Sequence, residues 1–96
     1  MEEIWCDIEG YEGLYKISNK GRVKSLHKGS DRILRPVIDK YGYMFVYLCN
    51  DSVRKYFRLH RLVAQAFIPN PYNLPEVNHK DENKLNNCVE NLEWIT

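Results

Sequence analysis

Residues 77–96, VNHKDENKLNNCVENLEWIT, decide the fold of this 96-residue chain. They contain two apolar-polar alternations separated by a polar loop that is rich in asparagine. Alternation with a period of two predicts a strand with one buried face, so we expect residues 76–79 and 89–96 to be extended and to pair as a hairpin. His79 stands beside Asn78 at the end of the first run. No other stretch of the chain is as typical of a reaction centre.

Upstream, residues 60–67 (HRLVAQAF) predict the one helix of the chain. Their apolar side chains recur at positions that form a single stripe along a helix. Pro69 and Pro71 follow and end the helical pattern, because proline lacks the backbone N–H that a helix needs.

Two hairpins precede this helix. Residues 14–18 and 22–26 flank an Asn-Lys-Gly turn, in which asparagine and glycine adopt positive φ at low cost. Residues 43–48 and 53–59 alternate around a second turn. Between the hairpins, residues 32–38 are a strand candidate whose proline favours a sheet edge. We therefore expect an α+β fold, with a small antiparallel sheet of two hairpins, one helix and the C-terminal hairpin. The aromatic residues that we assign to the core are Trp5, Phe57, Phe67 and Trp94.

The composition is that of an ordinary soluble globular protein of one domain, or of two sub-modules that share a core. No apolar run approaches the roughly 20 residues of a membrane span. The acidic N-terminus does not resemble a signal peptide, so we expect an intracellular, cytoplasmic protein. The cysteines are widely spaced and lack a C-x-x-C pattern, which predicts free thiols rather than disulfides or a zinc site.

Charge is distributed unevenly, although the whole chain carries only +1. Residues 1–13 carry −5, residues 14–62 carry +9 and residues 63–96 carry −3. A basic middle between acidic ends suggests a polyanion as partner. Lysines that only solvate the outer face of a sheet would give the same pattern, so charge alone leaves both interpretations open.

The side chains of Asn78 and His79 suit phosphodiester hydrolysis. Histidine can take a proton from water, and an asparagine oxygen can ligate a hard divalent cation, more weakly than a carboxylate does. Neighbouring residues on a regular strand point to opposite faces, so the two can converge on one phosphate only if the strand ends, bends or bulges there. If the segment folds as a hairpin, Asn91 can come back beside His79 and tie the loop through its amide.

An Asn-His pair before a polar loop does not by itself identify a nuclease, because asparagine-rich loops are usually turns. Three pieces of the sequence, HRLVAQAFIPNP, VNHKDENKLNN and NLEWIT, together resemble the HNH endonucleases of the phage and intron-encoded homing type. Residues 3–26, EIWCDIEGYEGLYKISNKGRVKSL, resemble the nuclease-associated (NUMOD-type) motif that often precedes such domains. The two motifs in this order are far more specific than either alone.

The resemblance implies a β-rich, nuclease-associated DNA-binding module at 1–58 and an HNH nuclease module at 59–96. It also implies a role for each candidate site residue. His79 matches the general base, Asn78 matches a ligand of the divalent metal, Mg²⁺ or Mn²⁺, and Asn91 matches the structural brace of the site.

The family's last metal ligand lies on a helix after the final strand, whereas this sequence stops at Thr96, before any such helix. We therefore expect a partial ββα-metal unit that lacks its final helix. From this we expect weak metal binding and little or no cutting, whether the chain is a fragment or a naturally short relative.

The resemblance implies double-stranded DNA as the partner, and the basic middle of the chain fits this independently. Cationic side chains neutralise phosphates, and a two-stranded ribbon fits the major groove. We expect Tyr43 to close the open side of the small sheet rather than to contact DNA. The candidates for DNA contact are Lys16, Lys20, Arg22, Lys24, Arg54, Arg58 and Arg61, some of which we expect to be only solvent-facing.

Two other functions stay open beside a DNA endonuclease. A non-catalytic module would bind duplex DNA in a salt-dependent way and would cut with no metal. A protein-interaction domain with a vestigial site would show no DNA affinity at low salt, and its acidic ends would be the more natural contacts.

Overall fold

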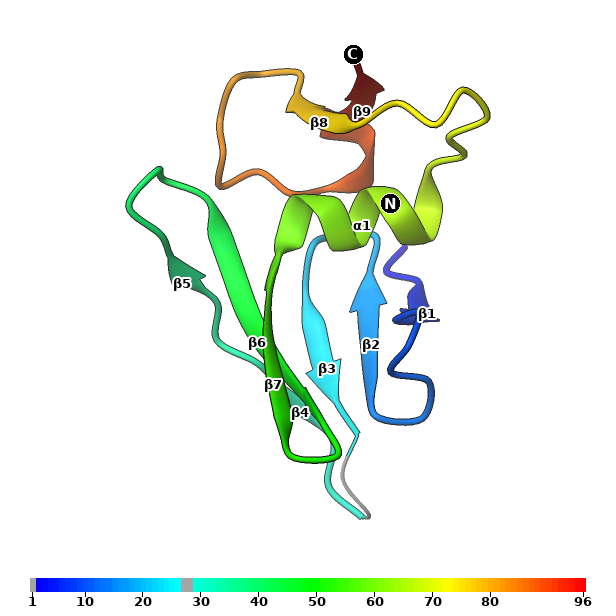
Figure 1. The fold of residues 1–96 in the computed structure, drawn as a ribbon, viewed down its shortest axis with the longest axis vertical. Helices are drawn as coiled ribbons and strands as arrows, with labels where there is room; N and C mark the ends of the chain where they lie inside the picture. The colour runs from blue at the N-terminus through cyan, green and yellow to red at the C-terminus, as the bar shows by residue number, and fades with distance from the viewer. Residues whose placement is uncertain (1, 27–28) are drawn as a thin grey trace.

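Within the described residues, 2–26 and 29–96, the computed structural model contains antiparallel sheets arranged around one α-helix (Figure 1). The first sheet has the order β1-β2-β3-β4, formed by Trp5–Asp7, Tyr15–Ser18, Val23–Ser25 and Arg32–Ile33. The second has the order β5-β6-β7, formed by Val37–Ile38, Met44–Asn50 and Val53–Arg58. The third pairs β8 (Glu76–His79) with β9 (Leu92–Ile95). Helix α1 spans Leu59–Phe67, and a 3-10 turn, Val89–Asn91, leads into β9.

The expected α+β class is confirmed, and so are both predicted hairpins, but the hairpins lie in separate sheets rather than in one. The predicted strand 32–38 is divided, because its first two residues join β3 and its last two join β6. Pro36 lies between these parts, and without a backbone N–H it cannot continue a sheet ladder. The chain leaves the first sheet at this point and enters the second, so each part is an edge strand.

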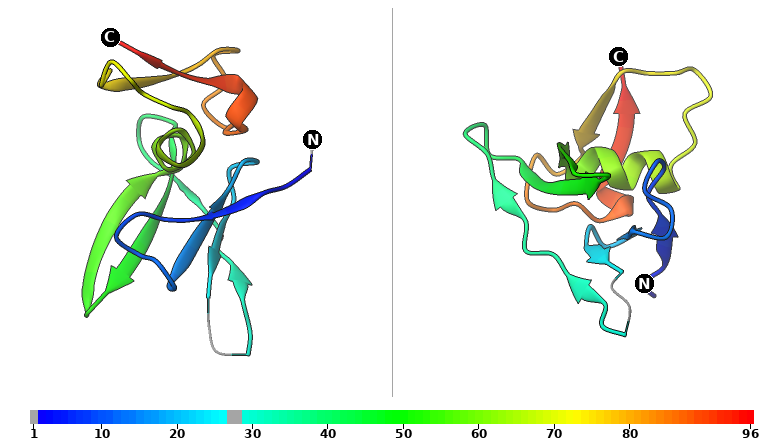
Figure 2. Two further views of the ribbon diagram at one scale, coloured as in Figure 1. Left: turned by 90° about the vertical axis from the view of Figure 1, so that its right-hand side faces the viewer. Right: turned by 60° about the horizontal axis from the view of Figure 1, so that its bottom comes forward.

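Helix α1 lies between the C-terminal hairpin and the two larger sheets, as the two further views also show (Figure 2). Its buried residues, Leu59, Leu62, Val63 and Ala64, form one cluster with side chains from every sheet. This cluster draws on residues 1–58 and 59–96 alike. The predicted helix is confirmed, one residue longer at its start. The other members of the cluster include Ile17, Val23, Val46, Leu48, Val77 and Leu92.

Phe57, Phe67 and Trp94 pack against the core as predicted, but the assignment of Trp5 to the core is wrong. The pairing of β1 with β2 sets Cys6 opposite Ile17, so Cys6 faces the core and its neighbour Trp5 faces outward. The Trp5 ring is covered instead by the ammonium group of Lys24, 4.1 Å from the ring centroid.

The cysteines Cys6, Cys49 and Cys88 are free thiols, as the sequence predicted. In the part of the chain that the structure describes, no helix is long and apolar enough to cross a membrane.

Candidate active site

Strand β8 ends at His79, where the sequence reasoning required the strand to end or bend. The pairing with β9 is regular up to this residue, which lies opposite Leu92. A turn follows, closed by the Glu82 N–H donating to the His79 carbonyl at 2.9 Å, and Glu82 adopts φ of +63°. His79 and Val77 face the protein interior, so Asn78 lies on the opposite face of the hairpin.

The His79 ring is held from several sides. Its side chain is only 5% exposed, and its Nε2 lies 2.8 Å from the Asn87 Oδ1. The centroid of the His60 ring is 5.0 Å away and that of Tyr43 is 6.1 Å away. Nδ1 makes no hydrogen bond to any described residue. Every fully buried side-chain nitrogen or oxygen of the described residues has a hydrogen-bond partner, so Nδ1 is not fully buried. Nδ1 is therefore the ring nitrogen that reaches the surface.

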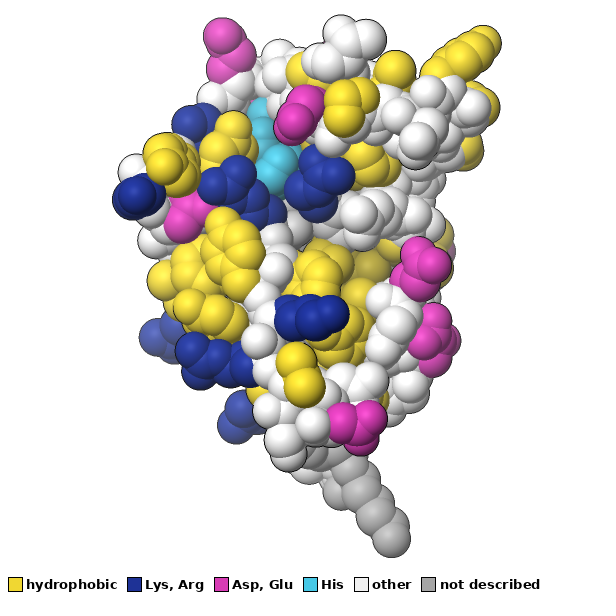
Figure 3. Space-filling view, in the orientation of Figure 1, with side chains coloured by type: hydrophobic (Ala, Val, Ile, Leu, Met, Phe, Trp, Pro, Cys, Tyr) yellow, Lys and Arg dark blue, Asp and Glu magenta, His cyan; other side chains and the backbone are white. Residues whose placement is uncertain are grey.

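A small histidine surface is visible on the face drawn in Figure 3, with Lys and Arg side chains on both sides of it. Arg58 lies over the ring of Tyr43, with its guanidinium carbon 4.3 Å from the ring centroid. The Lys84 ammonium lies 4.6 Å from the same centroid. An anion that approached the histidine surface would meet these cations first.

His60 joins His79 and Tyr43 in a cluster of rings (the ring cluster), although no pattern in the sequence had assigned it a role. It is 6% exposed and stacks on Tyr43 with the ring centroids 5.0 Å apart. Burial, followed by electrostatic interactions with His79, Arg61 and Arg58, lowers the pKa of His60 to about 4. His60 is therefore neutral near pH 7. The helical period could have found this residue, because positions 60, 63, 64 and 67 share one face of α1.

Asn91 lies at the other end of the loop and bonds to both of its arms. Its Nδ2 donates to the Asp81 Oδ1 and to the Asn86 carbonyl, each at 2.9 Å, while its Oδ1 accepts the Asp81 N–H at 3.1 Å. Its own carbonyl accepts the Lys80 N–H at 2.7 Å. Hydrogen bonds from Asn86, then from the Asn83 N–H and from Asn91, hold the pKa of Asp81 below its ordinary value. Asn91 thereby connects residues 80–81 to residue 86.

Asn78 donates from its Nδ2 to the Glu93 Oε2 at 2.8 Å, directly across the hairpin. The two side chains set an amide oxygen and a carboxylate side by side on the face opposite the His79 ring. Hard divalent cations prefer such oxygen ligands, and Glu93 brings the negative charge that asparagine lacks. The described residues contain no group of three His, Cys, Asp or Glu side chains arranged to hold a metal.

The predicted DNA contacts fall in two places. Arg58 and Arg61 lie beside the ring cluster, where Arg58 pairs with Asp39 at 3.0 Å and Arg61 donates to the Pro75 carbonyl at 3.0 Å. Arg54 lies near the tip of the β6–β7 hairpin, over the Tyr47 ring at 4.0 Å. The remaining candidates lie on the first sheet: Lys16 and Lys24 are cross-strand partners, Arg22 pairs with Glu3, and Lys20 is exposed in the turn.

Two family models match this sequence and together cover nearly all of it. The model described as an HNH endonuclease matches residues 57–96, and the NUMOD4 motif matches residues 3–49. The chain belongs to the HNH endonuclease family. The NUMOD4 match covers the first sheet, β5 and nearly all of β6, and the HNH match begins just before α1.

Relatives of this HNH chain include phage and viral proteins. The DNA endonuclease I-HmuI of Bacillus phage SP01 is 44% identical over 92 residues, which are 96% of this chain and 52% of that protein. An uncharacterised HNH endonuclease of Acanthamoeba polyphaga mimivirus is 48% identical over 82 residues, 85% of this chain and 24% of that protein. The chain thus spans about half, or less, of the length of these relatives.

The fold agrees with this family. A solved structure titled "DNA binding and cleavage by the HNH homing endonuclease I-HmuI" matches all of this HNH chain with a TM-score of 0.87 and 44% identity, over 53% of its own length. The family and the homing type predicted from the sequence motifs are therefore confirmed, whereas the roles of Asn78, His79 and Asn91 stay predictions.

Proposed function

We propose that this chain is the DNA-cleaving portion of an HNH homing-type endonuclease, with His79 as the general base. The observation that carries the proposal is the way in which the His79 ring is held. Asn87 holds one ring nitrogen, and the other reaches a surface lined by cations. A general base needs a fixed orientation and an accessible lone pair; the contact with Asn87 supports the first, and the exposed position of Nδ1 supports the second.

The surroundings of His79 suit a phosphodiester substrate. Arg58, Arg61 and Lys84 lie around the ring cluster and would attract the phosphate backbone. A water molecule between that phosphate and Nδ1 would lose its proton to the ring as its oxygen bonds to phosphorus. The bond from phosphorus to the leaving sugar oxygen would then break, and its electron pair would go to that oxygen. The neutral His60 ring, 5.0 Å from the His79 ring, adds no positive charge to this surface near pH 7.

A divalent metal, Mg²⁺ or Mn²⁺, would be held by the oxygens of Asn78 and Glu93. When bound, such an ion neutralises the phosphate and the leaving oxygen. Asn78 and His79 lie on opposite faces of the hairpin, so a phosphate within reach of both must lie across the free edge of β8. This donor set is small, and we expect correspondingly weak metal binding by residues 1–96 alone.

The cationic face of the first sheet would grip the duplex away from the cut. Lys16, Lys20 and Lys24 have no carboxylate partner among the described residues, whereas Arg22 is paired with Glu3. Each phosphate that these groups neutralise releases counterions, so the affinity should fall steeply with salt.

Plasmid nicking in Mg²⁺ or Mn²⁺ tests the proposal. It should be measured on residues 1–96 and, where the reading frame is longer, on its complete product, the full-length protein. We expect cleavage by the full-length protein and its loss in His79→Ala, with the duplex affinity unchanged. Full activity of His79→Ala would remove His79 from the mechanism.

A second candidate is a duplex-binding module that does not cut. The near-complete burial of the His79 ring favours this alternative, because little of the ring is left to meet a substrate. It predicts salt-dependent binding to duplex DNA and no nicking by the full-length protein in any divalent metal.

A further inference from the structure

We propose that Asn87 is a positioning residue that fixes His79 in its Nε2–H tautomer, and that the β2–β3 turn holds Asn87 in place. The catalytic importance of this arrangement rests on the proposed function. The tautomer itself is a property of the folded chain and can be measured without any cleavage.

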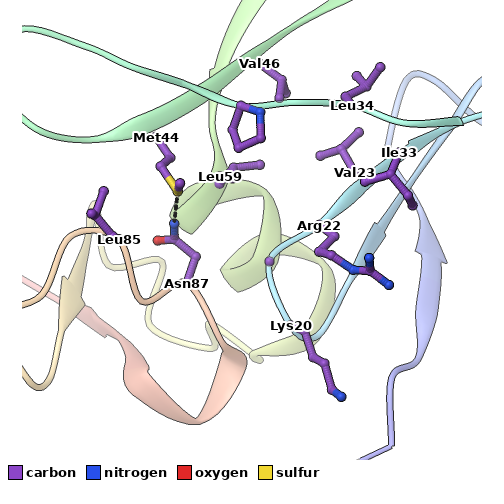
Figure 4. A pocket seen from close by; sticks show the side chains of 12 residues that line it. Lys20, Arg22, Val23, Ile33, Leu34, Met44, Val46, Leu59, Leu85 and Asn87 are labelled. Atoms are coloured by element: carbon purple, nitrogen blue, oxygen red, sulfur yellow. Dashed lines mark hydrogen bonds between the residues drawn. The ribbon is translucent and has the colours of Figure 1, made fainter.

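The direction of the Asn87 amide follows from its two neighbours. Asn87 is 5% exposed, and its Nδ2 lies 3.6 Å from the Met44 Sδ, as drawn in Figure 4. A thioether sulfur can only accept a hydrogen bond, so the NH₂ group belongs on this side. The amide oxygen then faces the His79 Nε2 at 2.8 Å.

The tautomer of His79 follows from the direction of that amide. An amide oxygen can only accept, so the His79 Nε2 must carry the proton that is shared with Asn87. Neutral imidazole has a single N–H, so Nδ1 carries the lone pair. Nδ1 is also the nitrogen that reaches the surface. Met44 and Asn87 thus set which nitrogen of the ring can act as a base.

The β2–β3 turn fixes the backbone of Asn87. A Cβ placed on Gly21 would lie 2.8 Å from both the Cβ and the carbonyl oxygen of Asn87, so only glycine allows this approach. Gly21 also has φ of +81°. Close by, the Val89 N–H donates to the Asn19 carbonyl at 2.8 Å. The hairpin of the NUMOD4 motif is therefore packed directly onto the residue that orients the candidate base of the HNH module.

Nitrogen-15 NMR of histidine-labelled protein tests the tautomer at about pH 9, where an ordinary histidine is neutral. The His79 signals can be assigned by their loss in His79→Gln. We expect the Nε2–H form to predominate in the unmodified chain. In Asn87→Leu the ring should populate both tautomers, and in Asn87→Asp, which keeps an acceptor oxygen, the Nε2–H form should persist. A predominant Nδ1–H form, or an unchanged ratio in Asn87→Leu, would overturn the proposal.

Two glycines provide a matched test of the turn. Gly21→Ala should displace Asn87 and change the His79 tautomer ratio. Gly13→Ala is the control, because Gly13 has a similar φ of +79° but nothing lies within 4 Å of an added Cβ. Equal ratios in both variants would remove the turn from the proposal.

If Gly21→Ala does not fold, Met44→Leu removes the sulfur acceptor at nearly constant volume and should also mix the tautomers. An unchanged ratio there would contradict the role of Met44 and Asn87.

Cleavage by the full-length protein gives a separate readout. Asn87→Leu should lower kcat by between about tenfold and about 10⁴-fold, the range known for partners that orient a functional histidine, and should leave KM nearly unchanged. Asn87→Asp should retain more of the rate than Asn87→Leu. If the unmodified protein does not cut DNA but the tautomer responds as described, the proposed function fails while the positioning role stands.

Discussion

His79 at the end of β8 and His60 at the start of α1 are both buried, but their surroundings differ. His79 and His60 are almost equally shielded, at 5% and 6% exposure, and their rings are 5.0 Å apart. His79 has a directional hydrogen bond to Asn87, whereas the His60 ring makes no hydrogen bond to a described residue and stacks on the ring of Tyr43. Burial alone therefore does not separate a candidate base from a packing residue, and the hydrogen-bond partner does.

The largest expected effect separates the two histidines by activity. His79→Ala should lower the nicking rate of the full-length protein by about 10²–10⁴-fold, the usual contribution of a general base. His60→Gln keeps a polar side chain of similar size and should cost less than about tenfold, because it leaves Nδ1 of His79 in place. Rates are measured in Mg²⁺ at saturating DNA, with duplex affinity as the control. Equal losses in both variants would mean that the difference between the two sites has no catalytic meaning.

The next effect is the contribution of His60 to the pH dependence of the unfolding free energy. The pKa of His60 is about 4 in the folded protein and ordinary when unfolded, so the unfolded state takes up the proton first as the pH falls. The stabilisation from neutral His60 is complete above about pH 6.5 and decreases towards pH 4, by up to about 3 kcal/mol. Urea unfolding between pH 7 and pH 4 measures this. In His60→Gln this part of the slope should disappear; if the slope stays the same, another group is responsible.

A smaller effect concerns the loop between His79 and Asn91. Asn91→Ala removes the side-chain bonds to Asp81 and Asn86 and leaves part-buried polar groups without these partners, which should cost about 1–3 kcal/mol of unfolding free energy. Asn83→Ala is the control, because Asn83 is exposed and, among the described residues, its side chain accepts only the nearby Leu85 N–H. Equal losses in the two variants would deny Asn91 its role as a brace.

The smallest effect concerns the cations around the ring cluster. Lys84→Gln should lower the dependence of log K on log salt for duplex binding by about one unit, since one phosphate contact is lost. Lys55→Gln, on the exposed β7 strand, should leave the slope unchanged. Identical slopes for the two variants would show that the duplex does not lie over the histidine surface.

Local signals in the sequence predicted most of the fold. The turn at Gly21, the stripe of α1 and the alternation of β6 each depend on neighbouring residues, and the structure agrees with all three. Pro36 correctly indicated an edge, but the passage of the chain from one sheet to another depends on packing that no local pattern contains. Trp5 was misplaced for the same reason, because the face it occupies depends on pairing with β2.

The candidate site was predicted only along its own segment. His79, Asn78 and Asn91 stand in one motif and could be read from it. Tyr43, His60 and Asn87 join the ring cluster from three different parts of the chain. Their contacts are tertiary, and an amide whose direction is set by a methionine sulfur leaves no recognisable pattern in a single sequence.

The close approach of Gly21 to Asn87 limits how such proteins can be recombined. A chimaera that grafts the N-terminal hairpin of one relative onto the nuclease module of another must keep a residue without a side chain at this turn. It must also keep a carbonyl positioned for the Val89 amide. A graft that breaks either contact would still carry every residue of both motifs, yet its imidazole would be free to turn. The fit of these two contacts, more than the source of each module, should decide which chimaeras are active.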